Sequence, residues 1–106
     1  MTIEEEIREF EQITKLMVDT YRRKHHDYGQ STKDTYRKYG PVSMAVRMRD
    51  KLNRFETLIE LEKRCDQIMV NESLFDTLLD LANYAIITLI EQKDLMRDRE
   101  MSKSSC

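Results

Sequence analysis

Three acidic residues in the last third of the chain stand four residues apart, at Glu72, Asp76 and Asp80. In a helix, which turns about 100° per residue, these acids and Asn83 lie within a stripe roughly 80° wide. Carboxylates so placed repel one another unless a cation or basic side chains neutralise them. The stripe therefore has two interpretations, a salt-bridged seam between helices or a site for a metal or another ligand. Mg²⁺ would suit such a site, because it takes oxygen ligands and keeps waters for a substrate phosphate.

A basic stripe precedes the acids, formed by Arg47, Lys51 and Arg54 at helical spacing. Two consecutive helices joined by a short loop pack antiparallel, and counting out from a loop at residues 65–70 brings Arg54 level with Asp80. The stripes then either form ion pairs that join the helices, or flank a pocket that holds a phosphate and its metal. The other positions predicted to face each other are Lys51 with Asn83 or Tyr84, and Lys63 with Glu72.

A third group of polar residues ends the first apolar-periodic segment, at His25, His26, Tyr28 and Gly29. Adjacent histidines point to different faces of a helix, so these two do not form a chelate by themselves. Tyr28, beside a predicted glycine stop, is placed either to stack on a nucleobase or to plug the end of a helix bundle.

The elements that position these residues are helices. The chain has only two glycines and one proline in 106 residues, which leaves few sites for tight turns. Thr2 and Glu5 form a capping-box pattern, Gly29 suits a helix C-terminus, and Pro41 suits the first turn of the next helix. We therefore predict an all-α bundle. Its parts are main helices at about 2–28, 41–64 and 72–97 and a short helical turn near 31–38, all in one domain at 1–97, followed by a flexible tail at 98–106.

The composition and net charge of the chain limit the kinds of partner and the cellular compartment that we expect. A net charge of -2 argues against direct DNA binding, and Cys65 and Cys106 lack the spacing of metal ligands. The acidic N-terminus does not resemble a signal peptide, and the apolar run 78–90 is too short and too polar to span a bilayer, so we expect a cytoplasmic protein. The apolar faces of three such helices exceed what a small monomer buries, which predicts a homo-oligomer, at least a dimer.

The motifs resemble those of the first nucleotide-modification-associated domain family, a small and largely phage-encoded family. The resemblance covers roughly residues 21–91. It implies a nucleotide or nucleotide-derived ligand, with phosphates on Arg47, Lys51 and Arg54, and it implies the cytoplasm of an infected bacterial host. The base or ribose would lie on Tyr28, Asn83 or Tyr84. The motifs are His26-Asp27-Tyr28-Gly29, Arg47-x-x-Asp50-Lys51-x-x-Arg54 and Glu72-Ser73-Leu74-x-Asp76-Thr77-Leu78-x-Asp80-Leu81-Ala82-Asn83-Tyr84-Ala85.

The chain is more distantly similar to MazG-like nucleotide pyrophosphohydrolases, which hold Mg²⁺ with Glu-x-x-Glu and Glu-x-x-Asp pairs on neighbouring helices. Here the corresponding pairs are Glu56-x-x-x-Glu60 and Glu72-x-x-x-Asp76. This spacing favours a protein that binds or sequesters its ligand. The alternative is a Mg²⁺-dependent hydrolase in which Glu72, Asp76 and Asp80 hold the metal and a metal-bound water attacks a phosphorus.

Overall fold

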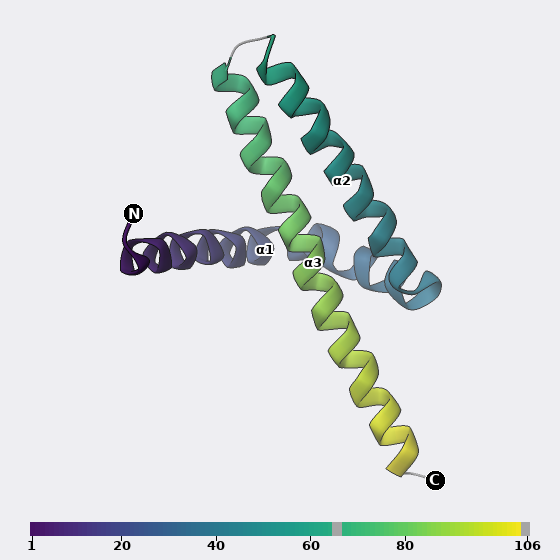
Figure 1. The fold of residues 1–106 in the computed structure, drawn as a ribbon. Helices are drawn as coiled ribbons and strands as arrows, with labels where there is room; N and C mark the ends of the chain where they lie inside the picture. Colours follow the sequence, from purple (N-terminus) through teal and green to yellow (C-terminus); the bar gives the residue numbers. More distant parts are fainter. Residues whose placement is uncertain (65–66, 105–106) are drawn as a thin grey trace. The chain divides into compact units, whose positions relative to one another are not determined.

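The structure is a computed structural model. It describes the backbone of residues 1–64 and 67–104, and it describes their side chains except those of residues 26–29, 67–71 and 102–104. The described residues form helices and no strand, which confirms the predicted all-α class. The helices are α1 (Ile3–Tyr39), α2 (Pro41–Glu62) and α3 (Gln67–Ser104) (Figure 1). The chain divides into two compact units, Met1–Asp34 and Thr35–Cys106, which are described separately below.

The first unit is the larger part of α1, and it begins as predicted. The backbone N–H of Thr2 donates to Glu5 Oε2, and the backbone N–H of Glu5 donates to Thr2 Oγ1, both at 3.2 Å. These reciprocal bonds satisfy two amides that the first helical turn leaves without partners. The acidic first turn also lies at the positive end of the helix dipole.

The predicted stop at Gly29 and the separate turn at 31–38 are wrong, because α1 is one helix from Ile3 to Tyr39. A lone glycine inside a helix costs only about 1 kcal/mol relative to alanine, which does not by itself end a helix. A hydrogen bond from Gln30 Nε2 to Asp34 Oδ1, at 2.9 Å, links two successive turns just after it. The helix ends instead at Tyr39, and the next residue, Gly40, has a positive φ of 77°.

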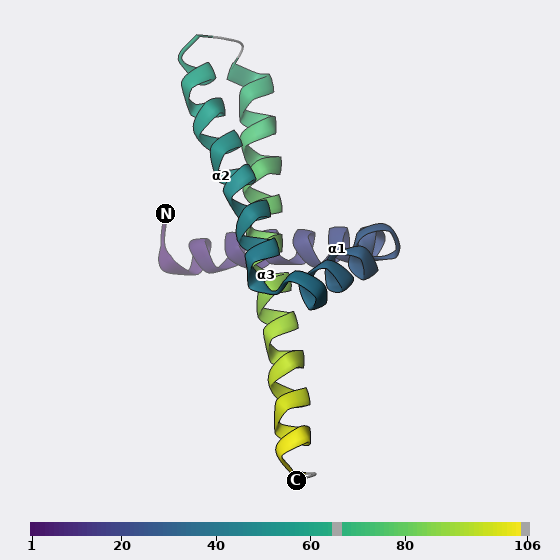
Figure 2. The ribbon, with the colours of Figure 1, turned by 90° about the vertical axis from the view of Figure 1, so that its right-hand side faces the viewer.

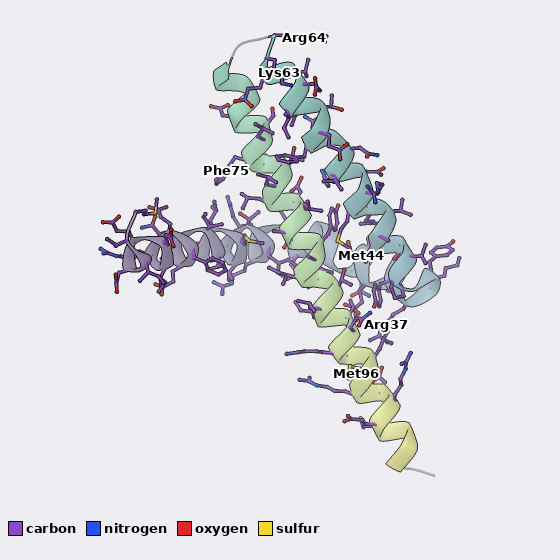
Figure 3. All side chains as sticks on the ribbon, viewed as in Figure 1. Arg37, Met44, Lys63, Arg64, Phe75 and Met96 are labelled. Carbon is purple, nitrogen blue, oxygen red and sulfur yellow. The ribbon has the colours of Figure 1, made fainter. Side chains whose placement is uncertain are left out.

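The second unit contains the last turn of α1 and an antiparallel pair of helices. Both ribbon views show α2 lying beside the first half of α3 (Figures 1 and 2). Met44, on the side of α2 that faces α3 (Figure 3), is 1% exposed, and Ile87 of α3 is 9% exposed. Tyr36 of α1 is also 1% exposed, so the core of this unit includes side chains from all three helices.

α3 is longer than predicted at both ends. It begins at Gln67 and continues to Ser104, through part of the segment that we expected to be a flexible tail. No glycine or proline follows Pro41 in the sequence, and Arg99, Glu100 and Met101 are good helix formers. Periodicity of apolar residues therefore located only the packed part of this helix.

Length and composition alone would allow a stretch within Glu72–Met101 to cross a membrane, with a mean hydropathy of 1.4. This differs from our expectation for residues 78–90, which left out the flanking apolar residues. The finding is weak evidence, because the core helix of a soluble protein passes the same test. The neighbouring helix α2 carries exposed charges at Arg49, Asp50 and Arg54, and the absence of a membrane partner stays our prediction.

Candidate functional site on the α2–α3 face

Two contacts define how the basic stripe of α2 meets α3. Lys51 Nζ lies 2.9 Å from Asp80 Oδ2, and the guanidinium carbon of Arg47 lies 5.8 Å from the centre of the Tyr84 ring. The two contacts are one helical turn apart on each helix, as antiparallel neighbours require. The structure therefore brings together, on one face of the helix pair, four of the residues that the sequence predicted for the site.

The pairing differs from the predicted one by about one helical turn. Lys51 and not Arg54 pairs with Asp80. Lys63, which directly follows α2, has its Nζ 3.8 Å from Glu60 Oε1 instead of pairing with Glu72. The predicted Arg54–Asp80 and Lys63–Glu72 pairs are therefore wrong. The physical reason is the position of the connection between the helices. Because α2 ends at residue 62 and α3 begins at residue 67, the connection is centred nearer to the N-terminus than the predicted loop at 65–70.

The Lys51–Asp80 ion pair lies at the surface. The two side chains are 28% and 47% exposed, so water screens their attraction and already solvates each charge. Exposed pairs of this kind contribute about 0.2–1 kcal/mol to stability. The pair is therefore a weak structural link, and Lys51 can leave Asp80 at little cost to bind another anion.

The Arg47–Tyr84 contact is a cation–π interaction, since the cation lies within about 6 Å of the ring centre. Both side chains are half-buried. The contact holds the guanidinium over the phenol ring, and Lys51 follows Arg47 by one turn of α2. Asn83, also half-buried, precedes Tyr84 and follows Asp80 by three residues. A cation, an aromatic ring and an amide are thus presented together, as a phosphate-bearing aromatic ligand requires.

The remaining predicted residues lie outside this cluster. Arg54 is exposed one turn beyond Lys51, while Asp76 and Glu72 are exposed one and two turns before Asp80. Among the described side chains, no group of three or more histidines, cysteines or acids is placed to hold a metal ion. The magnesium site at Glu72, Asp76 and Asp80 stays a prediction. The side chain of Tyr28 lies outside the described residues.

Residues 24–92 match the family described as nucleotide modification associated domain 1. The chain belongs to that family. The match covers well over half of the sequence and contains both stripes together with the whole of α2. No curated protein and no solved structure is significantly similar to this chain.

The sequence did not lead us to expect two buried polar residues, which lie inside the region that matches the nucleotide modification associated domain 1 family. Glu91 is 6% exposed and Tyr36 is 1% exposed. Neither Glu91 Oε2 nor the Tyr36 hydroxyl has a hydrogen-bond partner among the described atoms. The signal for Glu91 was its position, because it lies four residues after the buried Ile87 on the same helix face.

An ion pair between Arg37 and Asp94 was also missed. Arg37 Nη2 lies 2.9 Å from Asp94 Oδ2, and its other terminal nitrogen lies 3.8 Å from Asp98 Oδ2. It joins the last turn of α1 to α3 within the second unit. This pair was not predicted, because residue 37 was expected to lie in a separate short turn and not in the last turn of a helix that contacts α3.

Proposed function

We propose that the protein binds a nucleotide or a nucleotide-derived molecule on the α2–α3 face. The observation that carries the proposal is the position of Arg47 on the Tyr84 ring, one turn from Lys51. Membership of a family associated with nucleotide modification supports the same chemistry. A cationic and an aromatic group side by side match the two parts of a nucleotide, its phosphates and its base.

Each residue has a role that follows from its position. Arg47, Lys51 and Arg54 follow one another at four- and three-residue steps along α2, which suits a chain of phosphates lying along the helix. The Tyr84 ring provides a stacking surface for the base, and the Asn83 amide can both donate to and accept from the base or the ribose. Of the three predicted metal ligands, Asp80 is the one that contacts the basic stripe. A Mg²⁺ ion that accompanies the phosphates would therefore meet Asp80 first.

The observed contacts give little support to the alternative interpretation, in which the two stripes are a salt-bridged seam that only stabilises the fold. Exposed ion pairs add little to the stability of a fold unless several charges form a network. Here Lys51 and Asp80 are partly exposed, and Arg54, Asp76 and Glu72 are all at the surface. Three cations along one helix face are more readily explained by an anionic ligand than by a gain in stability.

A protein of this kind that holds its ligand unchanged would carry nucleotides for modification, or would sequester a nucleotide second messenger. Because the family resemblance is to phage proteins, we place this activity in the cytoplasm of an infected bacterium. The hydrolase alternative differs in one respect, that the ligand leaves the site chemically altered.

One experiment separates these functions. The purified protein is incubated with ribonucleoside and deoxyribonucleoside 5′-mono-, di- and triphosphates and Mg²⁺, re-isolated, and heated to release what it holds. Mass spectrometry that recovers an intact nucleotide supports binding. Recovery or accumulation of hydrolysed products shows the Mg²⁺-dependent hydrolase instead. No bound or altered nucleotide would refute the proposal and favour the structural interpretation.

A matched pair of variants locates the site in the same experiment. Replacing Arg47 and Lys51 together by methionine should abolish recovery of the nucleotide. The control is Arg49→Met, which removes a cation from the same helix at an exposed position off the stripe. Loss of the ligand from the control as well would place the site elsewhere.

A further inference from the structure

The cations of the α2–α3 face extend from the Tyr84 ring in one direction. The guanidinium of Arg47 lies over that ring, and the other two cations of the basic stripe follow it toward the connection between the helices. In the opposite direction, α2 begins with residues 41–46, which carry no charge. Beyond Tyr84 in that same direction, α3 has no basic residue before Lys93. The ring and Arg47 therefore mark one end of the positively charged surface.

The basic stripe is longer than one phosphate group. At the helical rise of about 1.5 Å per residue, the Cα atom of Arg54 lies about 10 Å along the α2 axis from that of Arg47, and Lys51 lies between them. The three side chains leave the helix within an arc of about 60°. A 5′-monophosphate carries its charge on a single group next to the sugar, near Arg47 and Lys51 when the base lies on Tyr84. A second or third phosphate is what brings negative charge level with Arg54.

Arg54 is available to bind such a phosphate. It is exposed, and it forms no ion pair within the part of the chain that the structure describes. Asp50 precedes it by four residues, a spacing that permits an ion pair on a helix, yet these two side chains do not form one. The planar guanidinium can donate two parallel hydrogen bonds to the oxygens of one phosphate. Because Arg47 and Lys51 are half-buried and Arg54 is exposed, the Arg54 end of the stripe is open to a longer phosphate chain.

We propose that the site selects nucleoside 5′-di- and triphosphates, and that Arg54 is the residue that distinguishes them from monophosphates. The base lies at the Tyr84 end of the site, and the phosphate chain points toward the connection between α2 and α3. This selection rests on the proposed function, since it requires a nucleotide on the α2–α3 face. It adds the orientation of the ligand, its minimum number of phosphates and the residue that detects them.

Equilibrium dialysis of the full chain tests the selection with ligands of one nucleoside that differ in their number of phosphates. The ligands are the 5′-mono-, di- and triphosphates of adenosine, guanosine, cytidine, uridine and thymidine, with Mg²⁺ present. The di- and triphosphates carry a methylene group in place of the oxygen between the α and β phosphates, so that this bond is not hydrolysed. For a nucleoside that binds, the parent should hold the triphosphate about tenfold more tightly than the monophosphate, a factor that one charge-assisted hydrogen bond to phosphate explains.

Three single variants locate the residue that detects the additional phosphates. Arg54→Met should weaken binding of the triphosphate about tenfold and leave binding of the monophosphate within about threefold of the parent. Arg47→Met should weaken binding of both ligands by a similar factor, because every nucleotide occupies the end of the site where Arg47 lies. The matched control is Arg49→Met, which removes the same charge from an exposed position of α2 off the stripe. It should keep the preference for the triphosphate within about threefold of the parent, since it changes the net charge alone.

The outcomes separate the phosphate selection from the nucleotide site itself. A parent that binds mono- and triphosphates equally would overturn the selection and leave the proposed function standing. If Arg47→Met and not Arg54→Met removes the preference, the ligand lies in the reverse orientation and the proposal is wrong. Equal weakening of both ligands in Arg54→Met, or equal weakening of the triphosphate in Arg54→Met and Arg49→Met, would also overturn it. Absence of binding for every nucleotide would refute the proposed function.

Discussion

The Lys51–Asp80 contact yields a quantitative prediction about what holds α2 and α3 together. The variants are Lys51→Met, Asp80→Leu and their combination, each compared with the parent protein. Because the side chains are 28% and 47% exposed, the pair belongs to the class of surface ion pairs, with a coupling free energy of about 0.2–1 kcal/mol. In Lys51→Met, water still reaches the carboxylate of Asp80, so the free energy of unfolding should fall by less than about 1 kcal/mol.

Urea unfolding followed by circular dichroism measures the four free energies, and their double-mutant cycle gives the coupling. The protein concentration is held constant, since association would otherwise shift the apparent stability. Arg49→Met is the control for the loss of a cation from α2. A coupling of about 3 kcal/mol or more, with a severe loss in Lys51→Met that the double variant recovers, is the behaviour of a buried pair. That result would refute our assignment of these charges to a ligand site.

Three further predictions concern the core and the chemistry of the site. Met44→Ala should lower the free energy of unfolding by about 2–5 kcal/mol, because the Met44 side chain is 1% exposed. The control Val42→Ala, at a side chain 68% exposed, should change it by less than about 0.5 kcal/mol in the same urea titrations. Equal losses in the two variants would contradict the described core. Glu91→Met should raise the free energy of unfolding by about 1 kcal/mol, since it removes a buried carboxylate oxygen without a described partner. The control Gln92→Met, at an exposed neighbouring position, should leave it unchanged. A lower free energy of unfolding in Glu91→Met would show that the carboxylate has a stabilising partner. Asp76→Asn should leave nucleotide binding measured by equilibrium dialysis unchanged or stronger, and loss of nucleotide turnover in this variant would indicate the hydrolase instead.

The helical class, the capping box and the start of α2 could be predicted because each depends on residues close together in sequence. The end of α1 could not be predicted from glycine alone. Gly29 and Gly40 both stand in polar surroundings, but Gly40 precedes Pro41, whose ring disfavours the helical conformation in the residue before it. The positive φ of 77° at Gly40 and the unbroken helix through residue 29 agree with that distinction.

It could be predicted that the two stripes face each other, but not which residue of one stripe lies opposite which residue of the other. Between residues 60 and 72 the sequence contains no glycine or proline, so nothing local marks where α2 ends. A shift of the connection by a few residues moves every cross-helix pair by about a turn. It is for this reason that Lys51 and not Arg54 meets Asp80. The buried Glu91 and the Arg37–Asp94 pair depend on packing among separate elements, which periodicity does not encode.

Calorimetric titration with the nucleotide recovered from the protein tests the central claim most directly. The parent should bind that nucleotide, and Arg47→Met with Lys51→Met should weaken binding more than about a hundredfold, since each charge-assisted contact to phosphate contributes about 1.5–3 kcal/mol. Arg49→Met should bind within about twofold of the parent, because it alters the net charge but not the stripe. Binding that is unaffected by the double change, or lost equally in Arg49→Met, would contradict a nucleotide site on the α2–α3 face.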